Sequence, residues 1–344
     1  MAMTARTADP LVRWFERAAI APAWLGVAIM LGYLALWGLY LTLRAALGLP
    51  PIGAEHTAAA SVTTGMLLGY LPAMNALLHR GLRRDLENLR PALHLEGEAG
   101  ERRLRSVTEP PARLLWSATV LGALLGGAVP TWDPVVSTLY GRMALDDPDF
   151  VWTLAHNMLL TALGLRVFAA QIHWTRSLAR LGREPIRVDL LDVQAFSPLV
   201  RAGQRSIVAW VLMTTIFSLY WVSDTAARAN VILPFAIAGV LVWVFVAPLT
   251  GVHRAIRATK QRELERVADA IRRVREQVLA ARPGDASTGV SLADLVAYHR
   301  LIDEVREWPI DVPGVLRIAA FLLVGLGSWL GGALVERGLD TLLR

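Results

Sequence analysis

Seven stretches of the chain carry apolar residues almost without interruption. Each is about 20 residues long, and a helix of that length, at 1.5 Å per residue, crosses a hydrocarbon layer of ~30 Å. The pattern therefore predicts an all-α, polytopic membrane protein with seven transmembrane helices. The predicted spans are residues 22–43, 58–78, 113–132, 150–171, 206–224, 231–250 and 313–335.

Basic residues are spread unevenly over the segments between these spans. Four loops contain 28 of the 35 basic residues, namely 1–21, 79–113, 172–205 and 251–312. The remaining segments outside the spans contain five, and Arg166 and Arg317 lie within spans. Because cytoplasmic loops of membrane proteins are enriched in Lys and Arg, the distribution predicts an N-terminus inside and a C-terminus outside.

The composition agrees with this topology and excludes several classes of protein. Of the 344 residues 54% are hydrophobic and only 19% are charged, which excludes a soluble globular enzyme, a disordered chain and a nucleic-acid binder. The chain has no Cys, hence no disulfide or thiolate chemistry. Lys260 is the only lysine, a bias typical of an Arg-rich bacterial genome, so we expect the bacterial inner membrane as the location.

The chain divides into three regions, which are residues 1–250 with spans one to six, 251–312, and 313–344 with span seven and a short outer tail. The middle region predicts a cytoplasmic helical hairpin. Its first helix carries an apolar heptad seam, formed by Leu264, Val267, Ile271, Val274 and Val278. Its second helix begins near Ser291 and ends before Pro309, directly ahead of span seven.

Polar side chains inside the predicted spans are the candidate functional residues, because such residues are costly in lipid and face a bundle interior or a wet path. The intramembrane candidates are Asn75, His156, Asn157 and Arg166. The candidate pore residues of span seven are Arg317, Ser328, Gly332 and Glu336. The alternatives are hydrogen bonding between helices and, for the two arginines, snorkelling toward the inner headgroups.

Glycine pairs and histidines have structural interpretations. Pairs four residues apart predict close helix contacts, at Gly65/Gly69, Gly122/Gly126 and Gly327/Gly331. His79, His173 and His253 lie at the predicted cytoplasmic ends of spans, where a helix dipole favours positive charge. No spacing indicates a metal site, a cofactor site or a known catalytic motif, so we expect no enzyme activity.

The layout resembles the insect odorant and gustatory receptor-like channels, which also have seven helices, an inner N-terminus and an outer C-terminus. The stretch from Ser328 to Glu336 is similar to that family's Thr-Tyr…Gln pattern, with Trp in place of Tyr and Glu in place of Gln. The resemblance implies a tetramer in which 313–335 lines the pore and 291–308 forms part of a central cytoplasmic anchor.

The sequence leaves three functions open. The first is a homo-oligomeric ion channel, with a tetramer favoured, whose pore is lined by span seven. The second is a non-conducting membrane scaffold or partner subunit that docks through its cytoplasmic hairpin. The third is a small-solute transporter. In each case the expected surroundings are the lipid bilayer, with no nucleic acid and no cofactor.

Overall fold

The computed structural model describes most of the chain as helices. The described residues are 9–18, 20–49, 54–90, 97–132, 148–181, 190, 192–219, 232–280 and 292–308, with the single positions 316, 319, 320 and 323. Every regular element in these segments is helical, so the all-α prediction is confirmed. The four candidate pore residues Arg317, Ser328, Gly332 and Glu336 lie outside the described residues.

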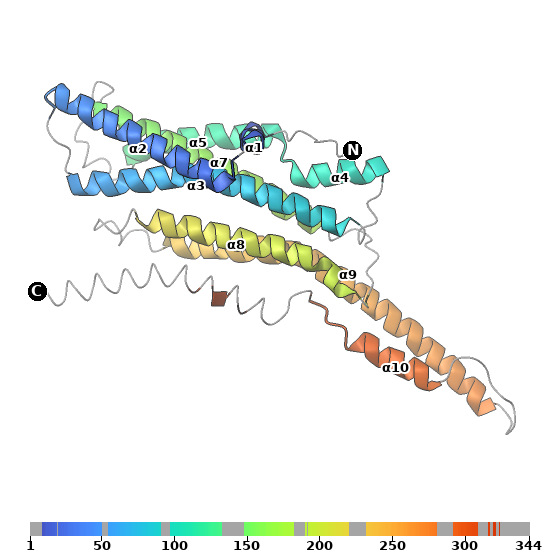
Figure 1. Ribbon diagram of the computed structural model, residues 1–344. Helices are drawn as coiled ribbons and strands as arrows, with labels where there is room; N and C mark the ends of the chain where they lie inside the picture. Colours follow the sequence, from blue (N-terminus) through green and yellow to red (C-terminus); the bar gives the residue numbers. More distant parts are fainter. Residues whose placement is uncertain are drawn as a thin grey trace, which may run out of the picture.

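The helices follow one another with the bounds α1 Pro10–Arg17, α2 Pro22–Ala46, α3 Ala54–Leu89, α4 Gly97–Thr108, α5 Ala112–Trp132, α7 Pro148–Leu181, η1 Val193–Phe196, α8 Ser197–Ser218, α9 Ile232–Ala280 and α10 Leu292–Asp303 (Figure 1). Six predicted spans overlap α2, α3, α5, α7, α8 and α9. Three of these helices continue well past the predicted span, and α9 is longest, with 49 residues. Polar residues of the intervening loops therefore extend existing helices.

Tight contacts between helices occur where the sequence places small residues. Gly69 of α3 faces the backbone of Gly26 in α2, and Gly122 and Gly126 of α5 face the backbone of α7. A Cβ atom added at Gly122 would lie 2.5 Å from the carbonyl oxygen of Thr161. The pairs Gly65/Gly69 and Gly122/Gly126 thus lie at helix contacts, whereas Gly327/Gly331 falls outside the described residues.

The main hydrophobic core lies where α3, α7, α8 and α9 pack together. It includes the fully buried side chains Leu86, Val167, Ile207 and Ile256. Beyond this core α9 extends away from the bundle, and α10 packs along the extended part (Figure 1). The seam residue Val267 is buried there, and Ile302 of α10 is buried as well.

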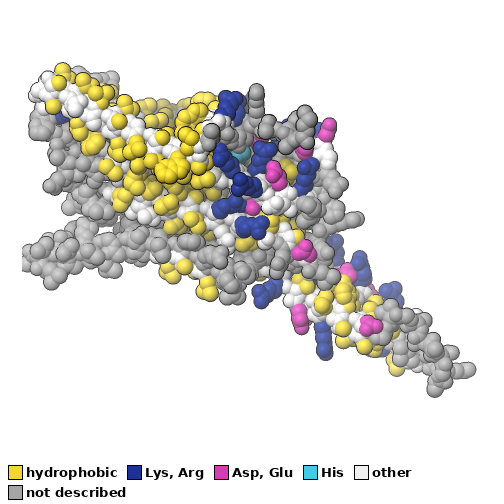
Figure 2. All heavy atoms as spheres, in the orientation of Figure 1, with side chains coloured by type: hydrophobic (Ala, Val, Ile, Leu, Met, Phe, Trp, Pro, Cys, Tyr) yellow, Lys and Arg dark blue, Asp and Glu magenta, His cyan; other side chains and the backbone are white. Residues whose placement is uncertain are grey.

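A broad apolar surface covers the other end of the molecule. Figure 2 shows hydrophobic side chains gathered over the region of α2, with charged side chains gathered toward α4, α9 and α10. Only 6% of the apolar stretch of α2 is buried. Among the described residues two helical segments, Pro22–Ala46 and Phe150–Leu181, are long and apolar enough to cross a membrane.

Candidate functional site

Arg166 of α7 lies at the centre of a buried polar contact. Its Nη2 donates to Oδ1 of Asp9 over 2.8 Å, and its Nη1 donates to Oγ1 of Thr119 over 3.1 Å. The guanidinium also lies 5.5 Å from the ring centre of Trp116. The two charged side chains are 4% and 5% exposed. The sequence predicts no protein partner for Arg166, and the structure shows that Asp9 is one.

Asp9 serves two helices at once. Its carboxylate accepts a hydrogen bond of 3.0 Å from the backbone N–H of Leu11, so it is the N-cap of α1, with Pro10 in the first turn. At the other end of α1, Arg80 of α3 donates to the carbonyl oxygen of Phe15 over 2.7 Å. Both ends of α1 are therefore fixed to the bundle, with Phe15 buried beneath it.

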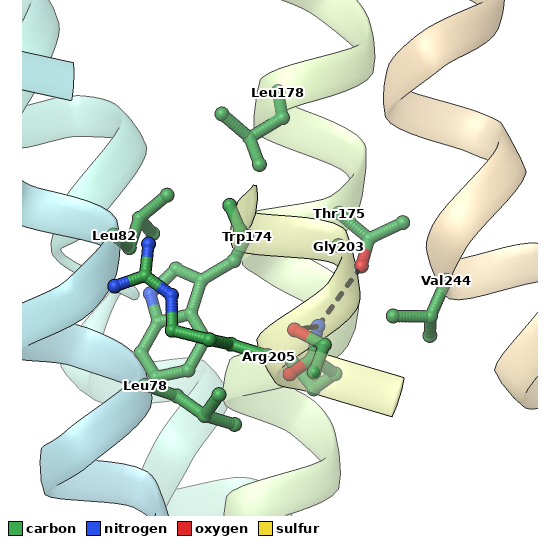
Figure 3. Close-up of a pocket in the computed structure, with 11 residues that line it drawn as sticks. Leu78, Leu82, Trp174, Thr175, Leu178, Gly203, Arg205 and Val244 are labelled. Carbon is green, nitrogen blue, oxygen red and sulfur yellow. Dashed lines mark hydrogen bonds between the residues drawn. The ribbon is translucent and has the colours of Figure 1, made fainter. Parts of the chain in front are cut away.

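A second polar centre lies between α7 and α8, around Gln171. Its amide nitrogen donates to Oγ1 of Thr175 over 3.3 Å and to Oγ of Ser206 over 3.4 Å, and all three residues are buried. The adjoining cavity has a volume of 20 Å³, enough for one water molecule. Figure 3 shows Trp174 and Val244 among the side chains around it. A cavity of this size accepts no larger solute.

Arg205 of α8 lies over one side of this cavity (Figure 3). It forms an ion pair with the buried Asp85 of α3 and donates to the carbonyl oxygen of Gly81 over 3.2 Å. A Cβ atom added at position 81 would meet the guanidinium, so the arginine would have to move aside. Burial, and secondarily repulsion from Arg84, lower the pKa of Arg205. The arrangement joins α8 to the extension of α3.

The third contact joins α10 to α9. The ring of His253 stacks on that of Trp308 with centroids 4.3 Å apart, and its Nδ1 is 3.1 Å from the carbonyl oxygen of Glu307. Lys260 donates to the carbonyl oxygens of Asp303 and Val305 over 2.6 and 3.0 Å. Since the last carbonyls of a helix lack partners within it, the lysine caps α10.

The other predicted residues are dispersed. Asn75 of α3 is 1% exposed, and its Oδ1 has no hydrogen-bond partner among the described residues. His156 and Asn157 are half-buried on α7, and the backbone oxygen of Asn157 accepts from Thr161. In the part of the chain that the structure describes, no hydrogen bond or ion pair joins any two of these residues, and the partners of Arg166 are Asp9 and Thr119. They do not form one site.

All three histidines at predicted span ends have defined surroundings, and the ring of the buried His79 lies 6.1 Å from that of Trp174. His253 belongs to the α9–α10 contact, and His173 lies with its Nε2 3.1 Å from the carbonyl oxygen of Ser106. Burial, and in smaller measure the charge of Arg180, lower the pKa of His173. Within the described ranges no three His, Asp or Glu side chains converge as metal ligands would.

Sequence reasoning missed Asp9 and Lys260 as contact residues. The dipeptide Asp9-Pro10 is a signal for a helix N-terminus, and Val12 and Phe15 follow it at helical spacing. Its partner in α7, however, is set by tertiary packing. Lys260 differs from the other basic residues only in being the one lysine of the chain, which does not indicate a partner.

Comparisons with known proteins leave the family of the chain open. No protein-family model matches it, and no curated protein or solved structure is significantly similar to it.

Proposed function

We propose that the chain is a seven-helix protein of the bacterial inner membrane, with its N-terminus inside, that forms a homo-oligomeric ion channel. In this proposal residues 313–335 line the pore, and a tetramer is the favoured assembly. The resemblance of the layout to the insect receptor-like channels belongs to the same proposal.

The apolar surface supports the membrane location. Large hydrophobic side chains on α2, α5 and α7 are about half exposed or more, for example Leu36 at 58%, Leu124 at 65% and Leu159 at 51%. Soluble monomers rarely expose contiguous apolar surface on this scale. The gathering of charged side chains toward α4, α9 and α10 in Figure 2 agrees with one cytoplasmic face.

The observation that carries the oligomeric channel is the exposure of apolar side chains on two sides of α10, where Leu301 lies opposite Leu292. Leu292, Val296 and Leu301 are exposed on this helix, which lies among the charged parts of the molecule. A second copy of the chain would cover them. Because α10 directly precedes residues 313–335, contacts between copies there would gather the last spans around one symmetry axis.

The α9–α10 contact supports a role for the hairpin in this assembly. Trp308, which stacks on His253 of α9, lies five residues before the predicted span 313–335. Any displacement of α10 against α9 would therefore be transmitted to the start of the pore-lining span. The one-water cavity at Gln171 also disfavours solute passage at that point of the single chain.

A scaffold is the second candidate, and a groove on the hairpin favours it. The groove has a volume of 420 Å³ and is lined by residues of α9 and α10 that include Ile271, Val296 and His299. A segment of another protein would fit there. In that case the exposed apolar side chains at this groove serve a heterologous contact and the chain does not conduct.

Conductance and size measurements separate the two candidates. The chain has no Cys, so Ser328→Cys creates a single thiol in the proposed pore. In liposomes, a water-soluble thiol reagent should block ion flux through this variant. It should leave flux through Leu124→Cys, a matched variant on an exposed apolar surface, unchanged. A strictly monomeric protein, or one without flux, would contradict the channel and favour the scaffold.

A reporter test addresses the topology separately. A reporter fused after Arg344 should report the periplasm, and one inserted after Pro283 should report the cytoplasm. If both reporters were found on the same side of the membrane, the seven-span arrangement would be contradicted.

A further inference from the structure

A groove between α5 and α7 is lined by apolar side chains and by two arginines. Its volume is 530 Å³. Leu114 and Leu121 of α5 and Leu165 and Phe168 of α7 line one part, whereas Arg176 and Arg180 of α7 line the other. An elongated amphipathic ligand fits this division better than a compact polar one.

The apolar part is open to the surroundings and hollowed by small side chains. Leu114 and Leu121 are 37% and 51% exposed. Ala118 and Ala169 line the groove between the larger side chains and have little exposed surface of their own. An alkyl chain lying there would make van der Waals contact with apolar side chains of both helices, which is the interaction that holds groups together inside a bilayer.

The basic part offers two cations at one turn of spacing, Arg176 and Arg180. Arg176 and Arg180 are exposed, lie four residues apart on the same side of α7, and have no carboxylate partner in the described part of the chain. Arg83 and Arg266, in contrast, pair with glutamates of their own helices. The guanidinium groups of Arg176 and Arg180, beside apolar side chains, complement a phosphate joined to an alkyl chain.

We propose that this groove binds an acidic phospholipid, with an acyl chain between α5 and α7 and the phosphate between Arg176 and Arg180. The proposal rests on the membrane location argued above. Residues 150–171 are the predicted span, so the two arginines follow its inner end by one to three turns. Basic pockets at this depth are suited to acidic headgroups.

The test measures which lipid stays with the protein. Protein in nanodiscs of equimolar phosphatidylglycerol and phosphatidylcholine is extracted into detergent, and the retained lipids are quantified by native mass spectrometry. We expect the wild-type protein to retain phosphatidylglycerol. The double variant Arg176→Gln/Arg180→Gln should lower the ratio of the two retained lipids by about 30-fold, given ~1 kcal/mol per arginine and 1.4 kcal/mol per tenfold.

Two further variants separate the groove from charge in general. Arg254→Gln/Arg257→Gln removes the same charge from exposed positions of α9 and should leave the ratio at the wild-type value. Ala118→Leu/Ala169→Leu keeps both arginines but fills the apolar part, and should release phosphatidylglycerol.

Three results would overturn the binding proposal. They are an unchanged ratio in the Arg176/Arg180 variant, an equal fall in the α9 control, and displacement of the lipid by inorganic phosphate alone, which would indicate a free-anion site. Alkaline carbonate treatment of membranes tests the location independently. Release of the protein would contradict the proposed membrane function, whereas retention combined with unselective lipid binding would contradict the groove alone.

Discussion

Arg166 and Asp9 form a buried ion pair although 157 positions separate them in the sequence. Both charges are almost completely removed from solvent, at 4% and 5% exposure. Such a pair holds because each charge compensates the other, and removing one partner leaves the second without compensation. The contact fixes the start of α1 against α7.

Asp9→Asn tests the charge without removing the helix cap, because the amide oxygen still accepts from the N–H of Leu11. Arg166 then remains buried without a counterion, and we expect a loss of about 3–5 kcal/mol in the free energy of unfolding. Trypsin should also cleave faster at Arg13 and Arg17 as α1 separates. Thermal unfolding and timed proteolysis provide the measurements.

Asp269→Asn is the matched control for this variant. It removes an equivalent charge from the exposed ion pair between Asp269 and Arg272 of α9. Exposed pairs contribute little, so its cost should stay within about 1 kcal/mol. Equal effects of the two substitutions would show that the Asp9–Arg166 contact adds nothing specific.

Gly126→Ala tests the close approach of α5 to α7. The added Cβ would meet the backbone of Asn157 and the Cα of Met158, the latter at 2.9 Å, and backbone atoms yield little. Overpacking of this kind costs about 1–3 kcal/mol. The melting temperature should fall accordingly.

Gly127→Ala provides the comparison at the neighbouring position of the same helix. There the added Cβ finds the side chain of Met158 at 3.5 Å, an ordinary contact. Alanine favours a helix over glycine by up to about 1 kcal/mol, so stability should be equal or higher. A stable Gly126→Ala protein would contradict the described packing of α5 on α7.

The sequence predicts the helices better than their partners. Apolar runs gave the all-α class, and the spacing of Gly122 and Gly126 indicated a close contact, because both signals are local. Arg166 received no partner, since pairing with Asp9 depends on how α1 folds back onto α7. The candidate pore residues, from Arg317 to Glu336, lie outside the described residues and stay predictions.

The pH dependence of stability should include a contribution from His173. Burial, and then the charge of Arg180, lower its pKa from the ordinary 6.5. As the pH falls, His173 therefore binds a proton at a higher pH in the unfolded chain than in the folded one. The stabilisation from neutral His173 is complete above pH 6.5 and is lost progressively below it.

Substitution isolates this contribution. His173→Gln should flatten the decline of the melting temperature below pH 6.5 relative to the wild-type protein. Arg180→Gln should raise the pKa of His173, as measured by NMR titration. The increase should be smaller than the one that full exposure of the ring to solvent would produce, because burial is the larger cause of the lowered pKa. An unchanged decline in the His173 variant would assign the pH dependence to other groups.

Lys260→Met tests how α10 is held against α9. The ammonium group donates to two carbonyl oxygens at the end of α10, at Asp303 and Val305, and methionine keeps the length of the side chain without the donors. Hydrogen bonds from charged groups contribute about 1.5–3 kcal/mol each when shielded, and partial exposure here places the expected loss at the lower end. Amide exchange should accelerate in α10 while that of α3 and α7 stays unchanged. Arg262→Met is the matched control, because among the described residues Arg262 bonds within α9 alone and its removal should leave α10 protected. If the amides of α10 exchange at the same rate in both variants, the stacking of His253 on Trp308 is sufficient to hold the hairpin. Lys260 is then not needed to position the chain ahead of residues 313–335.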